Sequence, residues 1–74
     1  MHFEPRGNRV VVEPQGLASA ESATNGLVTR TSPETQDWLG KNVEFPSPCG
    51  TVIEGESTKL LVLRVEDILG VWCK

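Results

Sequence analysis

Residues with reactive side chains are few in this chain of 74 residues, and their spacing argues against catalysis. Cys49 lies between Pro48 and Gly50 and is the natural candidate for a nucleophile. A cysteine needs a neighbouring base to form a thiolate, and His2, the single histidine, is far away along the chain. The sequence also has no glycine-rich phosphate-binding loop. We therefore predict a protein that is not an enzyme.

The carboxylates of the second half of the chain lead to the same conclusion. They are Glu54, Glu56, Glu66 and Asp67. Acid–base catalysis needs an environment, such as an apolar pocket, that moves the pKa of a carboxyl group, and nothing in the sequence predicts such a pocket around them. We interpret them as solvated surface groups. The Glu66-Asp67 pair is in addition predicted to cap a short turn before Ile68.

Neither a metal nor a disulfide is predicted to stabilise the fold. One histidine without a Cys-x-x-Cys pair lacks the ligand spacing of a zinc site. Cys49 and Cys73 allow a single bridge, but no apolar signal segment follows Met1, so the sequence does not support an oxidising compartment. No cofactor is expected. A domain this small has a limited core and needs another source of stability, for which self-association is the remaining candidate.

The charge pattern favours a protein partner. The formal net charge is −3, and the lysines and arginines are spread along the sequence. A nucleic-acid-binding surface needs a basic face, and no apolar run approaches the roughly 20 residues of a membrane span. We expect a cytoplasmic protein that binds neither nucleic acid nor membrane.

Most of the chain reads as short β-strands between glycine and proline turns. Strands are predicted over residues 10–12, 43–45, 51–54 and 59–64. Pro14 should end the first of them, because proline has no amide to donate. Residues 65–67 form at most one helical turn before residues 69–72 extend again. The pattern is that of an all-β domain, a small barrel or sandwich.

Residues 16–36 do not follow this pattern. Small polar side chains dominate, and the segment cannot bury enough apolar surface to offset a backbone entropy of roughly 1–2 kcal/mol per residue. Inside it lies one apolar pair, Leu27-Val28, after Asn25-Gly26, a dipeptide typical of type I′ hairpin turns. We predict a long loop, which is either a segment that folds on binding a partner or an exposed linker.

Both ends of the chain resemble those of the GroES-like co-chaperonins, which form ring-shaped lids on GroEL-type chaperonins. Residues 5–10, Pro-Arg-Gly-Asn-Arg-Val, follow the Pro-x-x-x-Arg-Val pattern of the family's first strand. Residues 59–72 follow its pattern of an apolar strand, a turn carrying Glu-Asp-Ile-Leu and an apolar tail. The resemblance implies that residues 1–74 form one small GroES-like β-barrel with a long mobile loop at about residues 16–36.

The resemblance also implies two sets of functional residues. In the family, a glycine and apolar residues of the mobile loop dock into the chaperonin, and the matching positions here are Asn25, Gly26, Leu27, Val28 and Thr29. Thr29 stands where the family usually has a third apolar residue. The family also joins the C-terminal strand of one subunit to the N-terminal strand of the next, and the matching residues are His2, Phe3, Glu4, Leu69, Val71 and Trp72. The implied assembly is a homo-oligomer, a heptamer in the family, that assists ATP-dependent protein folding. The alternative for Phe3 and Trp72 is that they cap the chain's own core.

The chain departs from the family between the loop and Gly40. Typical members have a further core strand and a roof hairpin there, whereas only about residues 30–38 fill the interval here. Trp38 would then pack where the apolar residues of the missing strand lie. A lid shortened in this way is similar to phage-encoded co-chaperonins, which act in the host cytoplasm. Two alternatives stay open: a monomeric β-barrel adaptor for another protein, and a decoy that occupies chaperonin docking sites without capping a folding chamber.

Overall fold

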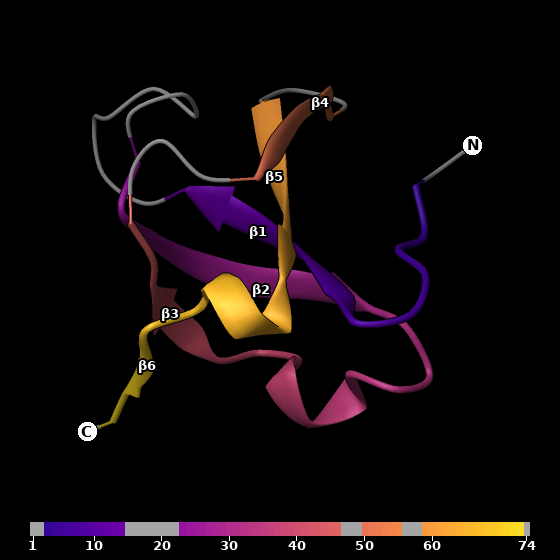
Figure 1. Cartoon of the computed structure of the whole chain (residues 1–74). Helices are drawn as coiled ribbons and strands as arrows, with labels where there is room; N and C mark the ends of the chain where they lie inside the picture. The colour runs from indigo at the N-terminus through magenta and orange to yellow at the C-terminus, as the bar shows by residue number, and fades with distance from the viewer. Residues whose placement is uncertain (1–2, 15–22, 47–49, 56–58, 74) are drawn as a thin grey trace.

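A computed structural model of the chain contains one antiparallel sheet of six strands (Figure 1). It describes residues 3–14, 23–46, 50–55 and 59–73. The strand order across the sheet is β4-β5-β1-β2-β3-β6. The strands are β1 (Arg9–Pro14), β2 (Asn25–Thr31), β3 (Asn42–Glu44), β4 (Thr51–Glu54), β5 (Lys59–Arg64) and β6 (Gly70–Trp72), with single-turn 3-10 helices η1 (Gln36–Trp38) and η2 (Val65–Asp67). The predicted all-β class is confirmed.

The strands predicted from apolar runs lie close to their predicted positions. The β-branched run at 10–12 lies within β1, and the run at 43–45 overlaps β3. The predicted bounds 51–54 and 59–64 coincide with β4 and β5, and the predicted turn at 65–67 is η2. β1 is central to the sheet, because Val11 lies opposite Val62 of β5 on one side and Arg30 of β2 on the other.

The predicted loop over 16–36 is wrong for residues 23–36, which the structure describes. Residues 25–31 form β2, which pairs with β1 along one edge and with β3 along the other. Val28 is buried in the core, and its amide donates a hydrogen bond of 2.9 Å to the carbonyl of Lys41. Paired backbone groups on both edges stabilise a strand that has few apolar side chains of its own. Residues 15–22 lie outside the described part of the chain, and a mobile segment there stays a prediction.

Gly26 lies inside β2 and allows a close approach between two strands. It is opposite Pro14 in the register and does not have the positive φ that a type I′ turn requires, so the predicted turn is wrong. A Cβ added to Gly26 would overlap the side chain of Val12 and lie 2.5 Å from the carbonyl oxygen of Glu13. The glycine is therefore needed for contact between β1 and β2.

The core lies on one face of the sheet. Alternate residues of β1 and β5 point to this face, as the strand period of two requires. Its fully buried members are Val10, Val12, Ala23, Val28, Val43, Phe45, Leu61 and Leu63. Trp38 of η1 packs against this core, and so do Val65 and Ile68 around η2. Residues outside the strands thus complete a core that one sheet face leaves partly open.

A buried polar cluster holds the segment that enters β1. Ser32 and Thr35, between β2 and η1, are 1% and 2% exposed. Ser32 Oγ donates to the carbonyl of Gly7 at 2.5 Å, and Thr35 Oγ1 donates to the carbonyl of Arg9 at 3.0 Å. The Ser32 amide in turn donates to Thr35 Oγ1 at 2.9 Å. Two hydroxyl groups therefore fix the start of the central strand.

Replacing Thr35 with valine should lower the free energy of unfolding by about 1–3 kcal/mol, because the buried Ser32 amide and Arg9 carbonyl lose a partner without a change in side-chain size. The matched control is Thr24→Val, at an exposed threonine, where we expect a change within about 0.5 kcal/mol. Urea unfolding followed by tryptophan fluorescence measures both. Equal effects of the two substitutions would contradict a stabilising role for the cluster.

Candidate subunit interface

Exposed apolar side chains gather near the two ends of the described chain. Five large hydrophobic residues are exposed in the described part, and four of them are Phe3 (44%), Leu69 (71%), Val71 (36%) and Trp72 (66%). The alternative that Phe3 and Trp72 cap the chain's own core is therefore wrong. His2, the remaining aromatic residue of the predicted interface, lies outside the described residues.

β6 carries two of these residues, Val71 and Trp72, on the edge of the sheet, and Leu69 lies immediately before it. It pairs with β3, with Val71 opposite Val43 and Trp72 opposite Asn42, and it is the last strand in the sheet order. All its residues are exposed. An exposed edge strand with apolar side chains favours pairing with another chain, unless something covers it.

The helical turn η2 directs the chain from β5 to this edge. The Val65 amide donates to the Asn8 carbonyl at 2.9 Å, and the Leu69 amide donates to the Glu44 carbonyl at 2.8 Å. Ile68, between them, packs against the core, whereas Leu69 is exposed. The chain thus leaves the core at Leu69 and continues along β3 as an edge strand.

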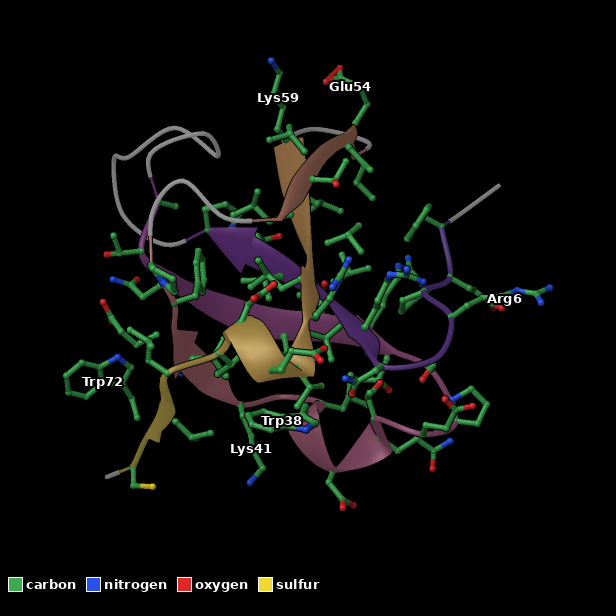
Figure 2. The ribbon with its side chains drawn as sticks, viewed as in Figure 1. Arg6, Trp38, Lys41, Glu54, Lys59 and Trp72 are labelled. Carbon is green, nitrogen blue, oxygen red and sulfur yellow. The ribbon has the colours of Figure 1, made fainter. Side chains whose placement is uncertain are left out.

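Side-chain hydrogen bonds fix both ends of this path. Asn8 Nδ2 donates to Glu66 Oε1 at 2.7 Å. Since η2 has no side-chain cap, the prediction that Glu66 and Asp67 cap this turn is wrong. Trp72 Nε1 donates to Glu44 Oε1 at 3.0 Å. Figure 2 shows the Trp72 side chain at the periphery of the molecule, pointing away from the sheet.

The N-terminal segment lies on the opposite side of the molecule from β6 (Figure 1). Pro5 is buried there, whereas Phe3 and Glu4 are exposed. A pocket of about 300 Å³ lies beside them, and its lining is Glu4, Pro5, Arg6, Gly7, Pro33 and Glu34. A concave surface with two prolines can accept an apolar or aromatic side chain of another chain. The two predicted interface segments are thus available on two different sides.

The residues matched to the family's chaperonin contact are not in a described loop. Asn25, Gly26, Leu27, Val28 and Thr29 all lie in β2, between β1 and β3. Gly26 and Val28 are buried, and the other three are half-buried. Their role in binding stays a prediction, and it would require β2 to leave the sheet.

Sequence reasoning missed Pro33 and Glu34, which line the N-terminal pocket. Ser32-Pro33 is a turn signal in the sequence, but only the Ser32–Gly7 hydrogen bond shows that this turn lies against the N-terminal segment. The pocket could not be found without knowing this long-range contact.

Comparison with known proteins leaves the family open, since no family model and no curated protein matches the sequence. Among the described residues, no group of His, Cys, Asp and Glu could hold a metal ion. Cys73 is an exposed free thiol, and Cys49 lies outside the described residues. No described helix has the length and hydropathy of a membrane span.

Proposed function

We propose that this protein is a co-chaperonin, a GroES-like β-barrel subunit whose ring caps a GroEL-type chaperonin and assists ATP-dependent protein folding without catalysis of its own. The observation that carries the proposal is the apolar edge strand β6, exposed on one side of the molecule, with the N-terminal segment and its exposed Phe3 on the other. The resemblance of both chain ends to the family supports the same assignment.

In the proposed ring, β6 of one subunit pairs with the N-terminal segment of the next. Two different surfaces of the same chain then meet, and such head-to-tail contacts close into a ring when the rotation between subunits allows it. Leu69, Val71 and Trp72 become buried, and burial stabilises by roughly 1.5–3 kcal/mol for each large apolar side chain. The pocket at Pro5 and Pro33 is the acceptor for one of these side chains. Ring formation also covers the edge of β6.

Since Asn25, Gly26, Leu27, Val28 and Thr29, the residues matched to the family's contact, are paired within β2, the proposed chaperonin contact is extended to the connection between β1 and β2, residues 15–24. This connection follows the first strand, which is where the family has its mobile loop, and Leu17 is its one large apolar residue. A single apolar contact binds weakly. Several copies on one ring raise the avidity by about 10²–10⁴, because every contact after the first is intramolecular.

The direct test mixes the purified full chain with a GroEL-type chaperonin and adenine nucleotide. Native mass spectrometry should show a closed oligomer, size-exclusion chromatography should show co-elution with the chaperonin, and the pair should refold a denatured client. A strictly monomeric protein at micromolar concentration would favour the adaptor. A ring that binds the chaperonin but inhibits refolding would favour the decoy.

Replacing Leu17 with aspartate should abolish co-elution with the chaperonin while the ring persists. Each contact loses the burial of a leucine, roughly 1.5–3 kcal/mol, which is about 10–150-fold in affinity for a single contact. The control is Leu39→Asp, at an exposed leucine (56%) in the turn before β3, which should leave binding unchanged. If Leu17→Asp binds as the unmodified protein does, the contact lies elsewhere in the chain.

A further inference from the structure

Three arginines that are far apart in the sequence lie on the face of the sheet opposite the core. Arg9 of β1 and Arg64 of β5 are direct register partners. Arg30 of β2 is the partner of Val11, which is two residues from Arg9 and therefore on the same face. All three arginines are exposed. A chain with a net charge of −3 thus concentrates positive charge on three adjacent strands.

Two of these arginines line a pocket of about 300 Å³. The described residues around it are Arg9, Gly50, Thr51, Val62, Leu63, Arg64 and Asp67. Gly50 has a φ of +75°, and a Cβ there would lie 2.5 Å from both the Val62 carbonyl oxygen and Leu63 Cδ2. This close approach lets Gly50 form one wall of the pocket directly over β5.

The register places two like charges, Arg9 and Arg64, side by side in the pocket. Directly opposite residues on antiparallel strands have Cβ atoms about 5 Å apart, and like charges at that position destabilise the pair. Asp67 lines the same pocket and offsets only one of the two positive charges.

We propose that this pocket binds a multiply charged oxyanion, a phosphate or a polycarboxylate, between the guanidinium groups of Arg9 and Arg64. Each guanidinium can donate two parallel hydrogen bonds to such an anion. The Thr51 hydroxyl is a further donor, and Val62 lies beside it in the pocket lining. Arg30, on the same face, adds attraction at longer range. The site uses neither β6 nor the 15–24 connection, so it does not rest on the proposed lid function.

The test follows backbone amide signals of the full, isotopically labelled chain by NMR during titration with inorganic phosphate, with ionic strength held constant by sodium chloride. We expect saturable shifts at Arg9, Thr51 and Arg64. Arg9→Gln and Arg64→Gln should each weaken binding about 10–100-fold, the fold-change of a lost hydrogen bond to a charged group. Both residues are exposed, so the variants should fold, which the spectra themselves report.

The matched control is Lys59→Gln, which removes one positive charge at the far end of β5 and should change binding less than about 2-fold, since salt screens distant charges. A second titration with citrate distinguishes the sources: saturation by phosphate alone assigns a phosphate ligand, and saturation by citrate assigns a carboxylate-bearing one. The proposal is overturned if neither anion gives saturable shifts at the pocket, or if Lys59→Gln weakens binding as much as Arg64→Gln.

Discussion

Trp72→Ala is expected to disperse the proposed ring into folded single subunits. The side chain is 66% exposed, so its removal costs little core packing. Its hydrogen bond to Glu44 is exposed as well, and the net contribution of such a bond is about 1 kcal/mol or less. As the central aromatic group of an interface, in contrast, a tryptophan commonly contributes at least about 2 kcal/mol. That is roughly 30-fold in the affinity of each contact, and every subunit of a ring makes two contacts.

The control for this experiment is Leu39→Ala, which removes another exposed apolar side chain (56%), from the turn before β3 instead of from β6 or the N-terminal segment. Sedimentation velocity at several protein concentrations measures the oligomer, and thermal unfolding measures the subunit. An oligomer that survives Trp72→Ala and dissociates with Leu39→Ala would move the interface to the turn before β3.

Gly26→Ala is expected to have the largest effect on the free energy of unfolding. The added Cβ would meet the Val12 side chain and the backbone of Glu13. Neither neighbour can move easily, because β1 is held between β2 and β5. Overpacking of this kind costs about 1–3 kcal/mol, and more where backbone must shift. Because a domain of this size has a stability of only a few kcal/mol, we expect a variant that is partly unfolded at room temperature.

Gly70→Ala is the matched control, since it makes the same change in another strand. No atom lies within 4 Å of a Cβ added to Gly70, and its φ is not positive. We expect a change within about 0.5 kcal/mol. Urea unfolding should be compared at a protein concentration where both variants are single subunits, because Gly70 lies in β6. Equal destabilisation by both changes would mean that strand propensity, and not the β1–β2 contact, determines the role of Gly26.

The strands with continuous apolar runs could be predicted from the sequence, and β2 could not. Between β1 and β2 the register shifts, so that Val11 lies opposite Arg30 while Val12 lies opposite Val28. Thr29 is therefore an extra residue, and such a bulge interrupts the alternation of side chains that identifies a strand. The remaining stabilisation of β2 comes from backbone pairing with β1 and β3. These pairings join separate segments of the chain and cannot be seen in the local sequence of β2.

The candidate interface was predictable only in part. The apolar tail at residues 69–72 stands out in the sequence, and its exposure follows from the turn at residues 65–67 that carries it past the core. The N-terminal pocket and the Arg9–Arg64 pair could not be foreseen. Both depend on long-range partners, namely the Ser32–Gly7 hydrogen bond and the β1–β5 register, which no local pattern encodes.

The placement of the two interface segments on opposite sides of the subunit has a consequence for mixtures. In the proposed ring, a Trp72→Ala subunit keeps its Pro5–Pro33 pocket and can still bind the C-terminal strand of one neighbour. It lacks the Trp72 side chain with which it would bind the other neighbour. Each altered subunit is therefore incorporated into an assembling ring and prevents that ring from closing. The fraction of closed rings should equal the fraction of unaltered subunits raised to the power of the number of subunits per ring. A minority of altered subunits is then enough to prevent most rings from closing.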